Sequence, residues 1–134
     1  MPSTLVDSNV ILDVVTEDAD WQDWSAAMLS DAAQRGPLVI NPLIYAEVSS
    51  RYATIEALDE ALPAGYYTRA PLPWEAAFLA AKCFETYRSR GGVKRSPLPD
   101  FYIGAHAAVA GLTLLTRDGR RYRTYFPKLR IIAP

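Results

Sequence analysis

LPDFYIGAHAAVAGLTLLTRD, which spans residues 98–118, contains a helix followed at once by a strand. An alanine-rich helix is predicted from Asp100 to Gly111, because glycine commonly ends a helix. Thr113 to Thr116 is a short, largely apolar segment of the kind that becomes a buried strand. Asp118 comes two residues after this segment, so the unit predicts an acidic side chain just beyond the end of a strand.

The same alternation of helix and strand extends along the rest of the chain. Apolar residues recur every three or four positions in several segments, and residues that favour helix ends stand beside them. Helices are predicted at Ile11–Val15, Asp20–Gly36, after Asn41, at Thr54–Leu62 and at Pro73–Gly91. Strands or extended segments are predicted at Leu5–Val6, Leu38–Ile40, Tyr66–Leu72 and Leu129–Ile132, and loops at 93–99 and 117–127, the latter with one helical turn. This order predicts an α/β fold with a parallel sheet covered on both faces.

The composition excludes several classes of protein. Half of the 134 residues are apolar and 22% are charged, which is unlike a disordered chain. No apolar run reaches the roughly 20 residues that cross a bilayer, and acids rather than bases follow Met1, unlike a secretory signal. Cys83 is the single cysteine, so an internal disulfide is excluded. We expect one domain over residues 1–134, located in the cytoplasm and without a membrane segment.

The net charge of −1 hides a strong asymmetry between the two halves of the chain. Residues 1–67 hold 11 acids and 2 bases, whereas residues 68–134 hold 4 acids and 12 bases. The basic residues crowd into two groups: Arg88, Arg90, Lys94 and Arg95, and then Arg117, Arg120, Arg121, Arg123, Lys128 and Arg130. They form either a surface for a polyanion, or solvated faces that pair with the acidic half or with a partner.

Four acids stand where a parallel sheet places its functional sites. Asp7 directly follows the first strand, and Asp118 follows the strand at Thr113–Thr116. Glu47 lies in the second turn of the helix after the second strand, and Asp100 opens its own helix. Because sites in open α/β sheets form beyond the carboxyl ends of the strands, these four side chains are predicted to converge.

Converging carboxylates need a cation, because like charges raise one another's pKa and disfavour ionisation. With oxygen ligands, and without a histidine cluster or a thiol pair, the expected ion is Mg²⁺ or Mn²⁺. Such ions activate water for displacement at phosphorus, so the expected substrate is a phosphodiester. Taken singly, each acid is also explained as a helix-dipole, turn or surface residue, and Asp13 is expected only at a solvated face or a cap.

In their order and settings, the four acids resemble the acidic motifs of the PIN-domain family of metal-dependent ribonucleases. Asp7 in LVDSNVILD resembles the first motif, Glu47 in NPLIYAEV the second, and Asp100 and Asp118 in LPDFYIGAHAAVAGLTLLTRD the third and fourth. The resemblance extends from Leu5 to Ile132. The compact size is similar to that of the toxin ribonucleases of bacterial type II toxin–antitoxin pairs, commonly called VapC.

The resemblance implies a three-layer α/β/α sandwich around about five parallel strands, with Mg²⁺ or Mn²⁺ held by the four acids. It implies that Asp7 and Asp100 ligate the ion directly and that Asp118 coordinates it through a water. Glu47 would ligate a second ion or orient the attacking water. The neighbouring polar residues that brace such a site are Ser8, Asn9 and Thr116. Gly119 and a run of arginines after Asp118 depart from the longer polar loop that is also common in the family.

The implied activity is endoribonuclease cleavage, with in-line attack of an activated water on phosphorus that leaves a 5′ phosphate. The implied partners are an RNA substrate, a small antitoxin protein and a second copy of the chain. Contacts to RNA phosphates are expected from Arg88, Arg90, Lys94, Arg95, Arg117, Arg120 and Arg121. The homodimer surface is expected on exposed aromatic helices around Trp21, Trp24 and Tyr45. Buried packing is expected of Tyr122 and Tyr125, with stacking on a base as the alternative, and His106 is expected to be a surface or core residue rather than a catalytic base.

Two alternatives remain open at this point. A phosphoaspartate phosphatase or a receiver domain also places an acid after its first strand, although Asn9 stands where the phosphatase needs a second acid. A receiver needs a lysine after its last strand, where this chain has only Ala133 and Pro134. The other alternative is a non-catalytic PIN-like module that binds RNA or protein.

Overall fold

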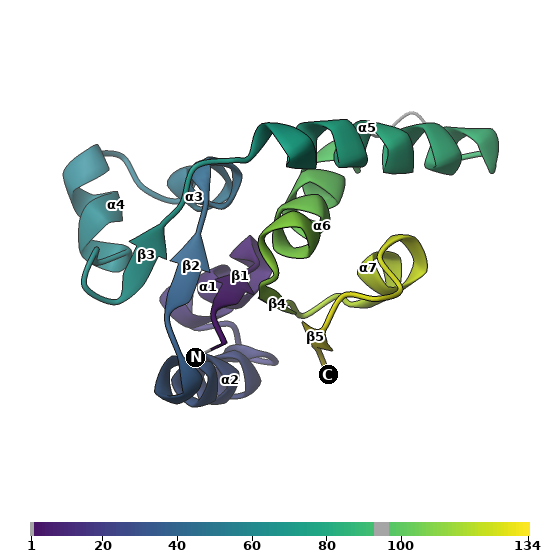
Figure 1. Ribbon diagram of the computed structural model, residues 1–134. Coiled ribbons are helices and arrows are strands. Elements are labelled where there is room, and N and C mark those ends of the chain that lie inside the picture. Colours follow the sequence, from purple (N-terminus) through teal and green to yellow (C-terminus); the bar gives the residue numbers. More distant parts are fainter. Residues whose placement is uncertain (1, 93–96) are drawn as a thin grey trace.

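The computed structural model describes residues 2–92 and 97–134 (Figure 1). Helices and strands alternate along most of this length, as the apolar patterning predicts. In chain order the elements are β1 (Thr4–Val6), α1 (Ser8–Val15), α2 (Gln22–Arg35), β2 (Leu38–Ile40), α3 (Pro42–Ser49), α4 (Ile55–Ala61), β3 (Tyr67–Arg69), α5 (Trp74–Ser89), α6 (Leu98–Ala110), β4 (Thr113–Leu115), α7 (Arg120–Tyr125) and β5 (Ile131–Ile132).

The five strands form one sheet in the order β3-β2-β1-β4-β5, and every neighbouring pair is parallel. Leu5 of β1 is in register with Val39 of β2 on one side and with Leu114 of β4 on the other. All five strands therefore end at the same edge. Because β1 and β4 are neighbours, the residues that follow these two strands lie beside each other, as the sequence predicts.

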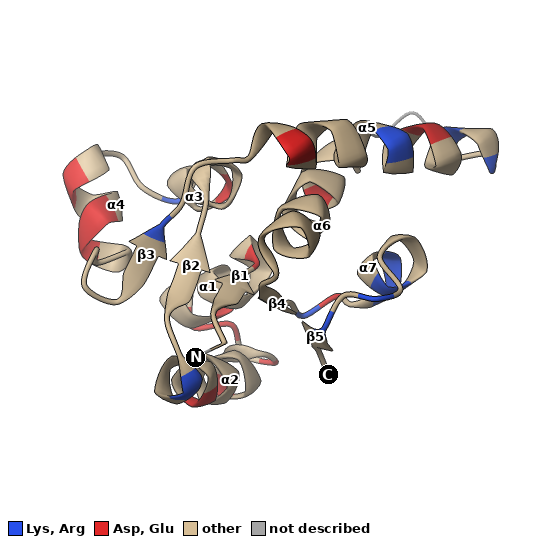
Figure 2. Ribbon diagram, viewed as in Figure 1, with Lys and Arg blue, Asp and Glu red and all other residues tan. Residues whose placement is uncertain are grey.

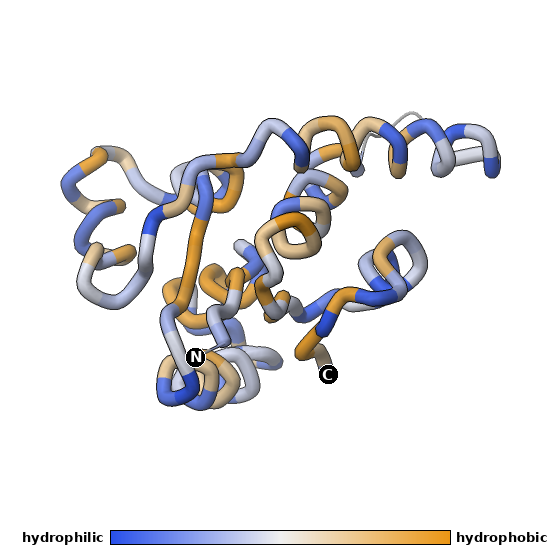
Figure 3. The backbone as a smooth tube through the Cα atoms, in the orientation of Figure 1, coloured by the Kyte–Doolittle hydropathy of each residue, from blue (hydrophilic) through white to orange (hydrophobic). Residues whose placement is uncertain are grey.

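The helices complete the predicted three-layer α/β/α sandwich, which is confirmed. Helix α1 packs against α2 and α3, and α5 packs along α6. Figure 3 shows the hydrophobic residues of β2 running through the interior of the fold. Leu5, Ile11, Phe101 and Leu114 are completely buried, and burial of a side chain of this size contributes roughly 1.5–3 kcal/mol to stability.

Local sequence signals fix the ends of the helices that carry the site. The side chain of Asn41 caps α3 by accepting a 2.9 Å hydrogen bond from the backbone N–H of Ile44. Gly111 ends α6 in the left-handed conformation, with φ of 68°. Within α6, a Cβ at Gly104 would lie 2.4 Å from the ring of Phe126, so glycine allows the chain after α7 to pack directly on α6.

Some boundaries differ from the expectation. Helix α2 begins at Gln22 rather than at a cap by Asp20, because the Asp18 side chain accepts hydrogen bonds from the backbone of Asp20 and Trp21 and holds them in a turn. The single helical turn expected within 117–127 is α7. Within residues 2–92 and 97–134, no helix has both the length and the apolar character needed to span a membrane.

Candidate active site

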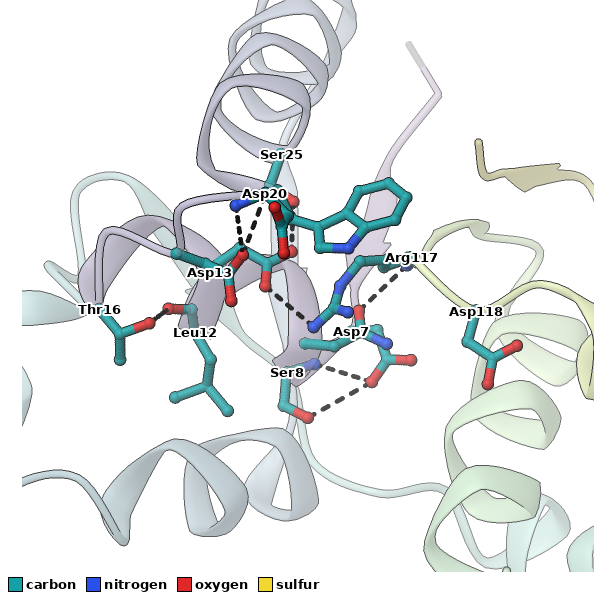
Figure 4. Close-up of polar contacts among 12 residues, drawn as sticks. Asp7, Ser8, Leu12, Asp13, Thr16, Asp20, Ser25, Arg117 and Asp118 are labelled. Carbon is teal, nitrogen blue, oxygen red and sulfur yellow. Dashed lines mark hydrogen bonds and ion pairs between the residues drawn. The ribbon is translucent and has the colours of Figure 1, made fainter.

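Asp7 lies at the centre of the candidate site, at the junction of β1 and α1. Only 4% of its surface is exposed. Its Oδ1 accepts a 2.8 Å hydrogen bond from the backbone N–H of Ser8, so the carboxylate caps α1 (Figure 4). Its Oδ2 accepts a 2.8 Å bond from the hydroxyl of Thr116 and a 3.0 Å bond from the hydroxyl of Tyr122. The Asp7 carboxylate is thus held by donors from three separate segments.

The electrostatic state of Asp7 follows from this position. Burial raises the pKa of Asp7 to about 6, against the opposing effect of the hydrogen bonds from Thr116 and Tyr122. The negative charges of Asp100 and Glu47 contribute to this rise. Asp7 therefore carries its charge at neutral pH at a substantial free-energy cost, which a nearby cation would relieve.

Glu47 faces Asp7 from helix α3. Its Oε1 accepts a 2.8 Å hydrogen bond from the hydroxyl of Ser8, and the same hydroxyl lies 3.5 Å from Oδ1 of Asp7. Burial raises the pKa of Glu47, the hydrogen bond from Ser8 opposes the shift, and the charge of Asp100 adds to it. Ser8 therefore links two of the acids that the sequence singled out.

Asp100 approaches the same edge of the sheet from the first turn of α6. Burial raises its pKa, while the hydrogen bond and the positive charge of Arg121 oppose the shift. The charge of Asp118 raises the pKa of Asp100 as well. Asp7, Glu47 and Asp100 are therefore close enough for each charge to affect another, whereas Asp118 acts on Asp100.

Asp118 occupies a more open position than the other three acids. It is exposed, in the turn between β4 and α7, and its backbone N–H donates a 3.2 Å hydrogen bond to the hydroxyl oxygen of Thr116. Figure 4 shows its carboxylate to one side of Asp7, with no contact drawn between them. The indirect, water-mediated role expected for Asp118 stays a prediction.

The three polar residues expected to brace the site form one hydrogen-bonded chain with Asp7. The side-chain amide of Asn9 donates to the hydroxyl oxygen of Thr116 at 3.3 Å, and its carbonyl oxygen accepts from the backbone of Arg117 at 3.1 Å. Thr116 in turn donates to Asp7, and Ser8 bonds both Asp7 and Glu47. These contacts fix the orientation of the carboxylates and the path of the turn after β4.

The donor set fits a hard divalent cation by its chemistry. All of the candidate ligands are carboxylate oxygens, and burial and mutual repulsion raise the pKa values of Asp7, Glu47 and Asp100, which an added positive charge would reverse. In the part of the chain that the structure describes, however, no three His, Cys, Asp or Glu side chains are arranged as a ligand group. The carboxylates nevertheless lie close enough to affect one another's pKa values.

Six of the seven basic residues expected to contact RNA fall into three groups, and Arg117 is the seventh. Arg88 and Arg90 at the end of α5 and Arg120 at the start of α7 are exposed. Figure 2 shows Lys and Arg, in blue, on both α5 and α7. Arg121 donates a 2.8 Å hydrogen bond to Oδ2 of Asp100. Lys94 and Arg95 lie outside the described residues.

Arg117, also expected to contact phosphate, makes contacts within the protein. Its guanidinium lies 3.0 Å from Oδ1 of Asp13 and 5.3 Å from the centre of the Trp21 ring (Figure 4). Its buried Nε has no hydrogen-bond partner in the described part of the chain. The side chain is 34% exposed and pairs with Asp13, and its contact with a phosphate stays a prediction.

The expectation that Asp13 lies at a solvated face or a cap is wrong. It is 2% exposed rather than solvated, and its Oδ2 accepts a 2.7 Å hydrogen bond from the hydroxyl of Ser25. Together with Arg117, this buried carboxylate joins α1, α2 and the turn after β4. The apolar spacing around Asp13 gave no sign of this pair, because its partner lies 104 residues away.

The aromatic residues differ in their exposure. Trp21, Trp24 and Tyr45 are each partly exposed, and the dimer surface expected around them stays a prediction. Trp74 and Phe78 on α5 are more exposed, by 88% and 66%. The homodimer itself stays a prediction.

Tyr122, expected to pack in the interior, and His106, expected at the surface or in the core, are both buried and both make polar contacts. His106 is a core residue, and its Nδ1 lies 2.9 Å from the side-chain amide of Asn41. The sequence did not predict the hydrogen bond from the Tyr122 hydroxyl to Asp7. One signal could have revealed it: Tyr122, Tyr125 and Phe126 recur at helical spacing, which places them on one face of a short helix directed at the sheet.

Comparisons with known proteins agree with this architecture. A family model described as PIN domain matches residues 4–127. Proteins of this family are generally nucleases that use a divalent metal. No curated protein sequence matches the chain.

Several solved structures are similar over nearly their whole length. VapBC2 from Rickettsia felis, bound to a promoter DNA fragment, is 15% identical with a TM-score of 0.74, and 98% of each chain is covered. VapBC-1 from nontypeable Haemophilus influenzae is 17% identical with a TM-score of 0.72, covering 98% of this chain and 97% of that one. FitAcB from Neisseria gonorrhoeae is 20% identical with a TM-score of 0.68, covering 96% of both. At these identities the likeness shows a shared fold.

Proposed function

The chain belongs to the PIN domain family, and from that premise we propose that it is a metal-dependent endoribonuclease acting through Asp7, Glu47, Asp100 and Asp118. The observation that carries the proposal is the electrostatic coupling of three acids at one sheet edge. Asp7 is buried, its pKa is raised to about 6, and the charges of Asp100 and Glu47 contribute to that rise. A site that makes its own carboxylates costly to ionise favours a divalent cation.

The side chains would have different roles in such a site. Asp7, Glu47 and Asp100 supply the oxygens that would hold Mg²⁺ or Mn²⁺, and Asp118 stands at the open side of the group. When bound, the ion supplies activation of water and neutralisation of charge developing at phosphorus. Thr116 and Tyr122 hold the Asp7 carboxylate in one orientation, and the hydroxyl of Ser8 holds that of Glu47.

Exposed arginines near the site support an RNA substrate. Arg88 and Arg90 at the end of α5 and Arg120 on α7 present positive charge to solvent on the basic half of the molecule. Phosphate contacts of this kind bind RNA without reading its sequence. The reaction needs no 2′-hydroxyl, so preference for RNA rests on the shape of the strand and on unstacked bases.

We further propose that the chain, as one domain over residues 1–134, acts in the cytoplasm as the toxin of a type II toxin–antitoxin pair. The similar structures from Rickettsia felis and Haemophilus influenzae are VapBC complexes, which supports a small antitoxin as partner. Induced expression is then expected to halt growth, and co-expression of the adjacent antitoxin gene to restore it. Growth unaffected by the induced wild-type chain would limit the proposal to a general nuclease.

The enzymatic proposal is tested on purified protein with labelled single-stranded RNA. Cleavage is expected with Mg²⁺ or Mn²⁺, and is expected to stop with EDTA and in Asp7→Asn and Asp100→Asn. Asp59→Asn is the matched control, because Asp59 is an acid that pairs with Arg69 and Tyr45 away from the site. Cleavage that persists in both site variants, with intact folding, would contradict the role of the acids.

A further inference from the structure

Arg121 stands in direct contact with one of the candidate metal ligands. We propose that its guanidinium takes the place of a cation at Asp100, and that a divalent ion binds only as this carboxylate is released. The inference rests on the proposed function, since it concerns the same site. It assigns Arg121 a positioning role that controls when Asp100 becomes a ligand.

The contact is a specific one. Arg121 projects from α7 and Asp100 from the first turn of α6, and their Nη1 and Oδ2 atoms lie 2.8 Å apart. Each side chain is 39% exposed, so the pair is half-buried at the rim of the site. The guanidinium also lies 5.8 Å from the centre of the Tyr87 ring on α5. Aromatic and carboxylate contacts together hold the arginine in one place.

This ion pair accounts for the arrangement of the acids. Asp7, Glu47 and Asp100 affect one another electrostatically, yet no three acids in residues 2–92 and 97–134 form a ligand group. One oxygen of Asp100, Oδ2, is occupied by the hydrogen bond from Arg121. Release of Asp100 from Arg121 would free that oxygen for an ion between the three carboxylates.

Release also has a consequence for Arg121. By thermodynamic linkage, the ion pair weakens binding of the divalent ion by the same free energy by which the bound ion weakens the ion pair. The freed guanidinium stays beside Tyr87 at the edge of the site, with its donors available to a phosphate of the substrate. Metal loading would thus present a positive charge to RNA that the metal-free protein keeps paired.

The test is the affinity for Mn²⁺ of metal-stripped full-length protein at one pH, measured by calorimetry and by the electron paramagnetic resonance signal of free Mn²⁺. Arg121→Gln is expected to bind Mn²⁺ about fivefold more tightly than wild type, the scale of a half-exposed ion pair. Arg120→Gln is the matched control, because Arg120 carries the same charge on the same helix and contacts no carboxylate among the described residues. This control is expected to stay within about twofold of wild type.

A second variant at the same position distinguishes loss of the ion pair from a folding defect. Arg121→Lys keeps the charge but loses the planar guanidinium, and its Mn²⁺ affinity is expected between those of wild type and Arg121→Gln. Equal affinities in all four proteins, weaker binding by Arg121→Gln, or equal tightening by Arg120→Gln would overturn the proposal and leave the nuclease function intact. Absence of Mn²⁺ binding in every protein would overturn the proposed metal-dependent function as well.

Discussion

The hydroxyl of Tyr122 donates a 3.0 Å hydrogen bond to Oδ2 of Asp7, across 115 residues of sequence. Both side chains are almost completely buried, with 2% and 4% of their surfaces exposed. The contact joins the last helix of the fold to the end of the central strand. Through it, the packing of α7 determines the orientation of the acid at the centre of the site.

Replacement of Tyr122 by phenylalanine removes this donor and keeps the ring. The hydrogen bond lowers the pKa of Asp7, so its loss raises that pKa further. We expect a loss of about 1 kcal/mol in the free energy of unfolding. RNA cleavage by Tyr122→Phe is expected to fall severalfold at pH 6 and to change little at pH 8, as shown by a pH–rate profile.

The matched control for this variant is Tyr125→Phe. Tyr125 lies on the same helix and packs against Phe101, and its hydroxyl has no hydrogen-bond partner among the described residues. Its pH–rate profile is expected to overlay that of wild type. A Tyr122→Phe profile that drops equally at every pH would mean that the hydroxyl does not act through the charge of Asp7.

The stability of the metal-free protein is expected to depend on pH through Asp7. Its pKa of about 6 in the fold lies above the unfolded value of 3.8, so the folded state binds more protons between these values. The stabilisation is complete below pH 3.8 and is lost as the pH rises through about 6. The stability of Asp7→Asn relative to wild type should therefore be greater at pH 7.5 than at pH 4.5, by roughly 2 kcal/mol.

Urea unfolding at the two pH values, in the presence of EDTA, measures this difference. Mn²⁺ added at pH 7.5 is expected to stabilise wild type and not Asp7→Asn, because the ion offsets the charge that burial penalises. A relative stability that does not change with pH would show that Asp7 titrates normally in the fold.

The pair of Asp13 and Arg117 is expected to stabilise the fold rather than to bind RNA. Removal of the guanidinium in Arg117→Met leaves a carboxylate that is 2% exposed with Ser25 as its remaining side-chain donor. We expect a loss of about 1–3 kcal/mol, and a smaller loss in the double variant Asp13→Asn/Arg117→Met than the sum of the single ones. A double-mutant cycle by urea unfolding measures this coupling, and strictly additive losses would show that the pair does not interact.

RNA affinity is expected to separate the exposed arginines from Arg117. In the background of Asp7→Asn, which is expected not to cleave, Arg90→Gln and Arg120→Gln should each weaken binding and reduce the salt dependence by about one phosphate contact. Arg117→Gln should leave the salt dependence unchanged. Fluorescence anisotropy with single-stranded RNA at several salt concentrations gives these slopes. A reduced salt dependence of RNA affinity in Arg117→Gln would show that Arg117 contacts a phosphate.

Much of the fold can be predicted from the local pattern of apolar residues in the sequence. The strands at Leu38–Ile40 and Thr113–Leu115 are predicted within a residue, because short apolar runs lie between residues that start or end helices. The position of Asp7 follows for the same reason, since a carboxylate directly after a buried strand points to the edge where parallel strands end.

Contacts between segments far apart in the sequence cannot be predicted from such local patterns. Asp13 is predicted at the surface because a carboxylate in a helix is ordinarily solvated, and only the fold brings Arg117 to it. Arg121 likewise reads as one of several basic residues until α7 is placed against α6. The direction of each arginine depends on helix packing, which is set by the whole core.

Mapping of RNA 5′ ends in cells shows whether the carboxylates around Asp7 cleave RNA. Cells in which wild type is induced are compared with cells that produce equal amounts of folded Asp7→Asn, by sequencing ends that carry a 5′ phosphate. We expect a set of new ends with wild type that is absent with Asp7→Asn. The same ends in both cultures, or no new ends in either, would contradict cleavage by these carboxylates.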